Sequence, residues 1–544
     1  MFAPGSPSPE VGRRSVPHLA KERERRFAWA PLALVLVLAL VAALHLRALD
    51  YRCDDAAINF RYVQNLLSGR GLVYNAGERV EGYSNLSWVL LLAAGAWLSG
   101  DVAASARVMN VLLSAACVLL TYSLATRSGL PRWRALLAPL LLSLSTPFAI
   151  WAGSGLESAL FAALISAAVL EQLRASSRPL VAGAWLGWLA ITRPEGALFT
   201  VVAAGYELWQ RRLRGALRLA LPALLLLALQ VGFRRVYYRQ WLPNTYFAKV
   251  DFSWAVAERG LGYLSHYAVH GTWLPVVVLL LGCLESVRRP KLRLMVLCLL
   301  AYLVWIVSVG GDGLFSFRFV AHVLPLGCVL AAHGTWGFCD RLALLAAGTP
   351  LYRVALPVLL ALCQCFPSAL LLLKPQWTWF EDNNGIRFPD PRYGWLVFDH
   401  YFVERVKRGG RYINDHAKAT DLIAAEPAGI AFYVRQPVLD LLGLNDLVIA
   451  RTRSSGARVG RAGHERSDAA YVLSRRPAYI LLDNVAVLPM PLDEAGVKEH
   501  LYMTAERDLW QSPEFHRDYE RVVVELEPSG PFRYFTYYRR RARK

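Results

Sequence analysis

Residues 53–85 read CDDAAINFRYVQNLLSGRGLVYNAGERVEGYSN and directly follow the first long apolar segment of the chain. This stretch, called the first loop below, is polar and opens with two adjacent carboxylates, Asp54 and Asp55. A carboxylate close to the edge of a bilayer is poorly solvated, so its pKa can move away from the aqueous value. We therefore expect the functional site to begin in the first loop.

The composition around the first loop is that of an integral membrane protein. Of the 544 residues, 55% are hydrophobic, and the mean hydropathy is +0.32, which is more apolar sequence than a soluble core requires. The pattern predicts a polytopic α-helical membrane protein with about eleven transmembrane helices. The expected spans are residues 27–46, 106–126, 135–150, 156–173, 179–192, 196–210, 216–236, 271–287, 292–309, 318–338 and 354–373.

The distribution of basic residues decides which apolar segments cross. Residues 86–98 are too short for a span, which needs about 17–25 residues. If this segment lies in the interface, the basic loops near residues 127–134, 174–178, 211–218 and 288–293 all fall on the cytoplasmic side, as the positive-inside rule requires. We therefore expect a multi-pass protein of the bacterial cytoplasmic membrane, with the first loop on the outer, periplasmic side.

The same assignment predicts a division into domains. Residues 1–26 form a cytoplasmic tail, and residues 27–373 form the transmembrane domain, in which residues 48–105 are the first external loop with interfacial helices. Residues 374–544 form an extracytoplasmic α/β domain. Short β-type runs separated by turn signals support this domain, and they lie at Leu422–Ala425, Ile430–Val434, Val438–Leu442 and Tyr479–Asp483.

The net charge of +19 does not indicate a nucleic-acid partner. Many of the basic residues occupy short loops between apolar segments, where they set topology and meet anionic lipid. The sequence contains no helix-turn-helix, RNA-binding or zinc-finger pattern. Membrane lipids are therefore expected as partners, and nucleic acid is not.

Four further polar motifs fall on the predicted outer side with the first loop. They are residues 151–158 (WAGSGLES), 192–196 (TRPEG), 240–251 (QWLPNTYFAKVD) and 310–318 (GGDGLFSFR). Each taken alone is compatible with a solvated turn. Ionisable residues at membrane depth are costly and usually functional, so the set as a whole predicts that the motifs converge on one site.

Helical spacing makes the two carboxylates of the first loop unequal. On a helix that begins near Cys53, Asp54 and Asp55 point about 100° apart. One of them can serve as a general base, which needs hydrogen-bond reach to the proton that it removes, and Asp54 is the first choice. The other then orients the base or binds a cation, and oxygen ligands suit Mg²⁺, Mn²⁺ or Ca²⁺. The structural alternative is that one carboxylate merely caps the helix.

Arginines near the predicted outer boundary are candidates for binding phosphate. Arg193 follows a span and precedes Pro194, and its planar, permanently charged fork suits a phosphate leaving group. Snorkelling at the membrane boundary is the structural alternative. Further phosphate-binding candidates are Arg318, Lys249 and Arg61. Candidates for binding sugar hydroxyls, chosen by side and polarity, are Glu81, Asn85, Glu157, Glu195, Asn244 and Asp312.

The order of these motifs resembles a known family. The run from residue 54 to 88, DDAAINFRYVQNLLSGRGLVYNAGERVEGYSNLSW, is followed by SGLESAL, TRPEG, LPNTYFAK, GGDG with FRF, and VLDLLGLND. Together they resemble the GT-C glycosyltransferases related to the terminal arabinofuranosyltransferases of mycobacterial cell-wall synthesis. One departure is Asn85-Leu86, where many relatives have Asn-Pro.

The resemblance implies an activity. It implies an enzyme that transfers a sugar, such as arabinofuranose or another pentose, from a polyprenyl-phosphate donor to a cell-envelope glycan or glycolipid by inverting displacement. It also implies that Asp54 and Asp55 form the acidic motif that serves as catalytic base or metal ligand. Two other classes stay open: a lipid or polysaccharide transporter, and a glycan-binding or assembly protein.

Overall fold

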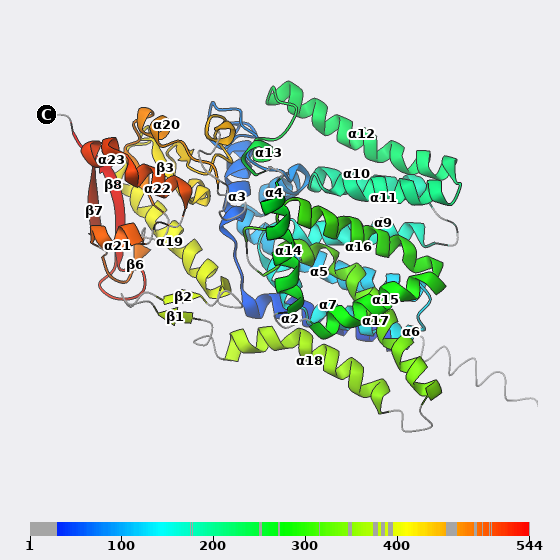
Figure 1. The fold of residues 1–544 in the computed structure, drawn as a ribbon. Helices are drawn as coiled ribbons and strands as arrows, with labels where there is room; N and C mark the ends of the chain where they lie inside the picture. Colours follow the sequence, from blue (N-terminus) through cyan, green and yellow to red (C-terminus); the bar gives the residue numbers. More distant parts are fainter. Residues whose placement is uncertain are drawn as a thin grey trace, which may run out of the picture.

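The computed structural model describes residues 30–174, 176, 178–249, 253–269, 273–314, 316–345, 351–373, 379–381, 387–389, 395–452, 465–482, 487–491, 493–499, 501 and 503–542. The expected cytoplasmic tail, residues 1–26, and the expected domain boundary near residue 374 lie outside this range. Figure 1 shows most of the helices gathered in one body and the main sheet, with its own helices, gathered at one end of it.

Among the described residues up to 373, the regular elements are helices. In chain order the helices are α2 (Ala30–Leu49), α3 (Asp54–Leu67), α4 (Leu86–Ser99), α5 (Val102–Arg127), α6 (Arg132–Ala135), α7 (Leu137–Ser143), α8 (Thr146–Gly153), α9 (Ser158–Gln172), α10 (Pro179–Thr192), α11 (Gly196–Trp209), α12 (Leu213–Tyr237), α13 (Asn244–Lys249), α14 (Trp254–Val269), α15 (Trp273–Arg288), α16 (Pro290–Ser308), α17 (Arg318–Leu345) and α18 (Tyr352–Leu373).

Five of the described helices are long and apolar enough to cross a membrane, or seven if each of two bent helix pairs forms one span. Several other expected spans form apolar helices of 10–17 residues, so the expected number of eleven stays a prediction. Residues 86–98, expected to lie in the interface, form one of these shorter helices, α4. The protein therefore has the several apolar helices of a polytopic membrane protein.

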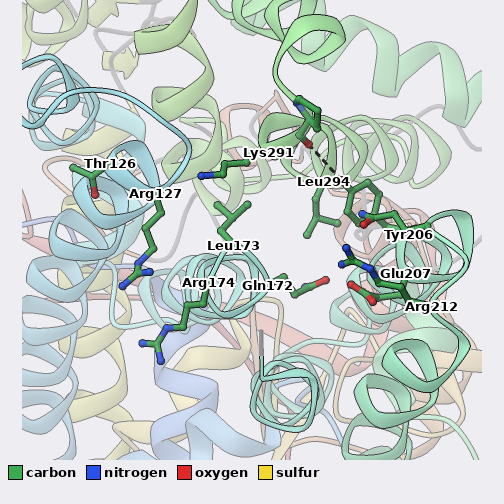
Figure 2. A pocket seen from close by; sticks show the side chains of 12 residues that line it. Thr126, Arg127, Gln172, Leu173, Arg174, Tyr206, Glu207, Arg212, Lys291 and Leu294 are labelled. Atoms are coloured by element: carbon green, nitrogen blue, oxygen red, sulfur yellow. Dashed lines mark hydrogen bonds between the residues drawn. The ribbon is translucent and has the colours of Figure 1, made fainter. Parts of the chain in front are cut away.

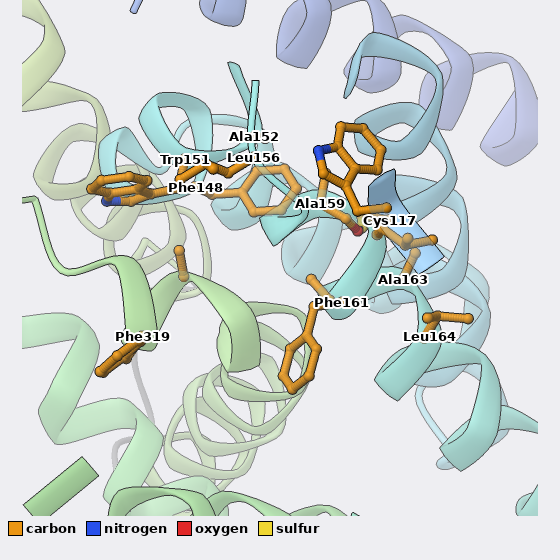
Figure 3. Close-up of a cluster of buried hydrophobic side chains, with 14 of the residues drawn as sticks. Cys117, Phe148, Trp151, Ala152, Leu156, Ala159, Phe161, Ala163, Leu164 and Phe319 are labelled. Atoms are coloured by element: carbon orange, nitrogen blue, oxygen red, sulfur yellow. The ribbon is translucent and has the colours of Figure 1, made fainter. Parts of the chain in front are cut away.

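Helix α17 lies at the centre of the helical body. It packs against α15, α9, α7 and α5. Of its most apolar stretch of 18 residues, 94% is buried inside the protein. Figure 3 shows the apolar side chains that gather beside it, among them Trp151 of α8, Phe161 of α9 and Phe319 of α17 itself. Burial of such aromatic side chains fixes where the first turn of α17, and with it Arg318, is held.

The C-terminal part carries a mixed sheet. The strands are β1 (Trp379–Glu381), β2 (Arg387–Pro389), β3 (Ile423–Ala425), β4 (Val438–Asp440), β5 (Tyr479–Leu481), β6 (Val487–Leu488), β7 (Tyr519–Glu525) and β8 (Tyr534–Arg540). β1 and β2 form a separate antiparallel pair. The main sheet has the order β4-β3-β5-β8-β6, with β7 also paired to β8, and β3 is parallel to both β4 and β5.

Helical segments accompany the sheet. They are α19 (Trp395–His416), η2 (Ala428–Phe432), η3 (Ile449–Arg451), α20 (Ala469–Ser474), α21 (Glu494–Glu499), α22 (Thr504–Gln511) and α23 (Pro513–Asp518). The segments η2 and η3 are 3₁₀ helices. These elements and the sheet give the segment the α/β character expected from its sequence.

One of the four expected strands is wrong. β3, β4 and β5 lie within their expected ranges, but the segment expected as a strand at Ile430–Val434 is largely occupied by the 3₁₀ helix η2. Pro427, with φ of −72°, precedes this helix, and the helix packs against α3. A run rich in β-branched and aromatic residues fits any half-buried surface, so burial against α3 explains the composition without a strand.

Candidate active site

The acidic pair occupies the first turn of α3. Cys53 precedes the helix in an extended conformation, with φ of −103°, and makes no side-chain cap hydrogen bond. Asp54 and Asp55 are therefore the first two helical residues, where the positive end of the helix dipole favours negative charge. The helix begins at the expected residue, and the two carboxylates lead to different neighbours.

Asp55 faces Arg318, at the start of α17. Its Oδ2 lies 3.9 Å from Nη1 of Arg318, and the Asp55 side chain is 33% exposed. The Nε and Nη2 atoms of Arg318 donate to the two carboxylate oxygens of Asp312 at 2.7 and 2.8 Å. Because this bidentate pair fixes the plane of the guanidinium, the Nη1 edge is aimed at the acidic pair.

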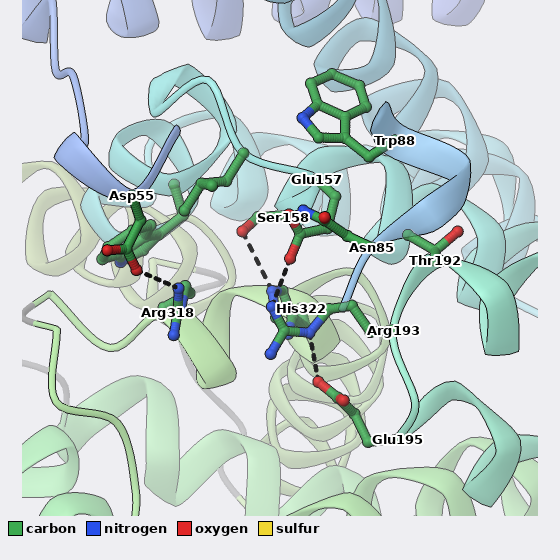
Figure 4. Close-up of polar contacts among 12 residues, drawn as sticks. Asp55, Asn85, Trp88, Glu157, Ser158, Thr192, Arg193, Glu195, Arg318 and His322 are labelled. Atoms are coloured by element: carbon green, nitrogen blue, oxygen red, sulfur yellow. Dashed lines mark hydrogen bonds and ion pairs between the residues drawn. The ribbon is translucent and has the colours of Figure 1, made fainter. Parts of the chain in front are cut away.

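Arg193 is held in a second ion-pair group. It is the C-cap residue of α10, and its Nη1 lies 2.5 Å from Oε1 of Glu157 while its Nε donates to Glu195. The amide of Asn85 donates to the other oxygen of Glu157 at 2.5 Å. All four residues are at least nine-tenths buried, so this group is a charge network kept from water. Figure 4 shows these contacts.

The two arginines flank one aromatic ring. The guanidinium carbon of Arg193 lies 5.6 Å from the ring centroid of Phe319, and that of Arg318 lies 5.3 Å from it. Arg318 also lies 5.5 Å from the ring centroid of Trp151. Aromatic faces attract cations most strongly when water is excluded. The rings therefore hold the two guanidinium groups close together, each of them already paired with two carboxylates.

A buried polar chain lies beside the arginines and was not expected from the sequence. His322, one turn after Arg318 on α17, contacts Oγ of Ser158 at 3.2 Å through Nε2 and the hydroxyl of Tyr302 at 2.7 Å through Nδ1. Ser158 directly follows Glu157. The sequence signal that could have revealed it is an ionisable residue inside an apolar helix, four positions after a candidate arginine.

Asp54 faces the C-terminal part of the chain. A Cβ atom added to Gly429 of η2 would lie 2.2 Å from Oδ1 of Asp54, so the carboxylate and the Gly429 backbone are in close contact. Burial, together with the negative charge of Asp54, raises the pKa of the Tyr433 phenol just after η2. Asp54 is therefore positioned between α3 and the C-terminal part, whereas Asp55 points towards the arginines.

The first loop and the start of α4 contact all four polar motifs, and the motifs of Glu157, Arg193 and Arg318 lie together. Trp88 of α4 donates to the carbonyl of Gly155 at 3.0 Å, and the hydroxyls of Ser87, also in α4, and Thr192 lie 2.7 Å apart. The backbone amide of Asn244 donates to the carbonyl of Glu81 at 3.0 Å. The Asp55–Arg318 pair supplies the fourth contact.

Two predicted binding residues, Arg61 and Asn244, lie instead in a clamp that joins the first loop and α13 to the C-terminal part, and a third, Glu81, pairs with α12. Arg61 donates to the carbonyls of Tyr74, Val434 and Gln436. Asn244 donates to the carbonyls of Gly443, Leu444 and Asp446. Glu81 forms a bidentate pair with Arg234, at 2.5 and 3.1 Å. Their polar groups serve internal contacts, and the structure does not bring them to the arginine pair.

The clamp contains further hydrogen bonds from the first loop. Asn75 donates to the carbonyl of Val438 at 2.9 Å and accepts from its amide at 3.0 Å, in the manner of a residue added to the edge of β4. Tyr74 donates to the carbonyl of Ala428 at 2.6 Å. The hydroxyl of Tyr62 contacts Oδ1 of Asn445 at 3.0 Å. η2 and Gly429 are thereby fixed against α3.

Lys249 is the remaining phosphate-binding candidate. It ends α13 and is exposed, and none of the polar contacts among the described residues joins it to Arg193 or Arg318. Its place in the fold gives it no geometric link to the acidic pair.

Replacing Glu81 by Gln tests whether this residue is structural. Burial raises the pKa of Glu81 and the Arg234 guanidinium opposes this shift. Breaking such a buried pair leaves the arginine uncompensated, so we expect a loss of about 3–5 kcal/mol in the free energy of unfolding. The control is Glu78→Gln, an acid 48% exposed, for which we expect a change under about 1 kcal/mol. Equal stability of the two variants would contradict the structural role.

The donor set offers little to a metal ion. Within the described residues there is no group of three or more His, Cys, Asp or Glu side chains that could hold one. The acidic pair alone supplies two carboxylates that point to different neighbours. These residues do not fit a divalent cation, and the steps derived below do not use one.

Sequence comparisons identify two curated relatives, both named terminal β-(1→2)-arabinofuranosyltransferase. The protein from Mycobacterium tuberculosis is 32% identical over 266 residues, which cover 44% of this chain and 42% of the relative. The protein from Corynebacterium glutamicum is 27% identical over 409 residues, which cover 63% of this chain and 55% of the relative. The chain spans about half the length of the curated relatives it matches. The expected resemblance to arabinofuranosyltransferases is confirmed.

A structural comparison covers more of the chain, and a family model matches part of its C-terminal region. The crystal structure of the Archaeoglobus fulgidus oligosaccharyltransferase, tethered to an acceptor peptide containing the NVT sequon, has a TM-score of 0.53 at 11% identity and covers 93% of this chain and 74% of that one. This likeness shows that the chain shares the fold of that oligosaccharyltransferase. Residues 399–539 match a family model described as a domain of unknown function, DUF8728, a range that begins within α19 and ends within β8.

Proposed function

We propose that the chain is a membrane glycosyltransferase of the GT-C class that moves a sugar from a polyprenyl-phosphate donor to a glycan or glycolipid acceptor of the cell envelope. The reaction takes place at the outer face of the bacterial cytoplasmic membrane. The observation that carries the proposal is the acidic pair of α3 facing Arg318, which lies with Arg193 around Phe319. The names of the two relatives make arabinofuranose the first sugar to test.

The arginines bind the phosphate of the donor. Arg318 presents its Nη1 edge, because Asp312 occupies Nε and Nη2. Arg193 adds a second positive charge near the same Phe319 ring. Fixed donors aimed at developing negative charge stabilise a transition state without reorganisation, and removing one such donor costs about 3–4 kcal/mol. Both arginines are buried among the helices.

Asp54 is the general base. It takes the proton of an acceptor hydroxyl, whose oxygen forms a bond to the anomeric carbon as the bond from that carbon to the phosphate oxygen breaks. The bonding electrons leave with the polyprenyl phosphate, and the configuration inverts. An inverting displacement needs the base and the leaving group on opposite faces of the sugar. Asp54, facing Gly429, satisfies this better than Asp55, which lies beside the phosphate-binding Arg318.

The other acids position the arginines. Sequence reasoning gave Glu157, Glu195 and Asp312 to sugar hydroxyls, and their contacts support a different role, because each pairs with Arg193 or Arg318. Asn85 in turn holds Glu157. Asp55 orients the Nη1 edge of Arg318. Buried charges held in this way keep the phosphate site preorganised.

The direct test uses the purified full-length protein in nanodiscs with a synthetic polyprenyl-phosphate arabinofuranose and an arabinan acceptor. We expect release of polyprenyl phosphate together with an acceptor heavier by one pentose, measured by mass spectrometry. A lipid or polysaccharide transporter, the alternative, would move its cargo across the membrane without cleaving the sugar–phosphate bond. Absence of cleavage with every pentosyl and hexosyl donor tried, alongside unchanged surface glycans in a deletion strain, would reject the transferase.

Gly429→Ala tests the contact between η2 and Asp54. The new methyl group would lie 2.2 Å from Oδ1 of Asp54, so the carboxylate must turn away from its position. A catalytic group displaced by about 1 Å can cost on the order of 10²-fold in rate, and we expect this fall in kcat with little change in the KM for the donor. The control is Gly232→Ala in α12, where an added Cβ meets nothing within 4 Å. Full activity of Gly429→Ala would remove η2 from the site.

The donor set also gives an expectation about metal dependence. Because the described residues offer no three-ligand group, we expect transfer to persist in excess EDTA, with Arg193 and Arg318 supplying the positive charge. The measurement is the initial rate with and without chelator, followed by addition of Mg²⁺, Mn²⁺ or Ca²⁺. Loss of activity that a cation restores would show that the acidic pair binds a metal after all.

A further inference from the structure

A cleft lies at the other end of the helical body from the candidate active site. Its volume is about 590 Å³, and it is formed where α5, α9, α11 and α16 end or begin (Figure 2). Its charged lining residues are Arg127, Arg174, Glu207, Arg212 and Lys291. We call this hollow the basic cleft.

The helices themselves separate the basic cleft from the active site. α9 begins at Ser158, next to Glu157, and ends at Gln172 in the basic cleft. α11 begins beside Glu195 and ends at Trp209. A helix of about 14 residues is roughly 21 Å long, so the two sites lie about one apolar helix apart. The basic cleft therefore does not belong to the arginine pair at Phe319.

Positive charge dominates the basic cleft. Figure 2 shows Arg127 and Arg174 at one side, Arg212 beside Glu207 at the other, and Lys291 between them. Arg174 lies 3.1 Å from Glu171. Among the ion pairs of the described residues, none involves Arg127 or Lys291. Four cations with two carboxylates, Glu207 in the lining and Glu171 beside it, leave an excess of positive charge that suits an anion.

The surroundings of the basic cleft indicate that this anion is attached to a lipid. Leu173 and Leu294 line it with the cations. Next to it, Trp209 is 64% exposed and lies against Tyr206, with ring centroids 5.8 Å apart. Exposed tryptophan and tyrosine are typical of the headgroup level of a bilayer. The basic cleft thus combines a phosphate-binding charge with apolar walls at the depth where lipid headgroups lie.

We propose that the basic cleft binds the phosphate of an anionic phospholipid. Basic pockets between transmembrane helices hold such headgroups by charge, while the acyl chains follow the apolar helix surfaces. Basic residues that only set topology need no shared hollow, whereas these four converge on one. A soluble phosphorylated molecule has the same headgroup chemistry but gains nothing from Leu173 and Leu294, so the lipid is the favoured source.

The test is native mass spectrometry of the full-length protein from nanodiscs of equal parts phosphatidylglycerol and phosphatidylcholine. We expect one retained phosphatidylglycerol. In the Arg127→Gln/Lys291→Gln variant we expect its affinity to fall about 30-fold, the loss expected for two cations near a lipid phosphate. The two substitutions leave no carboxylate without its partner, because neither residue has an ion pair among the described residues.

The control carries the same change of charge outside the basic cleft. Arg214→Gln/Arg218→Gln removes two exposed cations of α12 that do not line the cleft, and we expect it to retain the lipid. Equal loss in both variants, or no preference for phosphatidylglycerol in the wild type, would overturn the proposal. Displacement of the lipid by millimolar glycerol 1-phosphate would contradict a phospholipid ligand and favour a soluble phosphorylated molecule. None of these outcomes depends on glycosyl transfer.

Discussion

Asp54→Asn lowers kcat for sugar transfer by about 10²–10⁴-fold, the usual contribution of a positioned general base. The amide has nearly the same shape as the carboxylate and cannot take the proton of the acceptor hydroxyl. Gly429 leaves room for either group, so we expect expression and thermal unfolding to match the wild type. The measurement is the steady-state rate of pentose transfer at saturating donor.

Two variants make this result specific to Asp54. Asp101→Asn is the matched control, since Asp101 is an exposed N-cap whose side chain accepts from the amides of Ala103 and Ala104, and Asn caps as well as Asp does. Asp55→Asn acts through the orientation of Arg318, so we expect a smaller fall in kcat than Asp54→Asn gives. Full activity of Asp54→Asn, or a larger fall in kcat for Asp55→Asn, would move the base away from Asp54.

Arg318→Lys is expected to lower kcat by about 10²–10³-fold, the usual result of removing one preorganised donor at developing charge. Lysine keeps the charge but has no planar fork. It cannot make the bidentate pair with Asp312 and also present a donor towards Asp55. Because the loss falls on the transition state, the KM for the donor should change less than kcat. The readout is the ratio of these two effects.

The chain contains a matched pair for this substitution. Arg134 of α6 makes a bidentate pair with Asp340 at 2.6 and 3.0 Å. Asp340 lies in α17, towards the end opposite to Arg318. Arg134→Lys breaks the same kind of contact far from the acidic pair, and we expect less than about a twofold change in rate, since a partly exposed pair contributes little. Equal effects of the two lysine variants would mean that Arg318 supports α17 and not the phosphate.

Much of the site could be predicted from local sequence. A polar stretch next to an apolar span, two adjacent acids and arginines at helix ends are features that position along the chain reveals, and the structure brings Asp55, Arg193 and Arg318 into one cluster. The 3.6-residue period of a helix also predicts that the side chains of Asp54 and Asp55 point in different directions.

The rest depends on contacts between distant segments. Nothing near Arg61 or Asn244 in the sequence shows that backbone carbonyls of the C-terminal part use up their donors. For the same reason the sequence does not predict the contact between Gly429 and Asp54. The composition of η2 is also compatible with a strand, because its burial against α3 involves a distant segment. His322 was missed for a different reason: a single histidine in an apolar helix gives no sign of whether a serine and a tyrosine lie within reach.

The clamp that joins the first loop to the C-terminal part also bears on biosynthesis. Tyr74 and Asn75 leave the ribosome long before Ala428 and Val438, their partners in the clamp. At about 5–20 residues per second the delay is on the order of tens of seconds. During that time Asp54 has no η2 beside it. The wall next to Asp54 therefore forms only after residue 438 has been made, and a chain terminated before η2 would lack it.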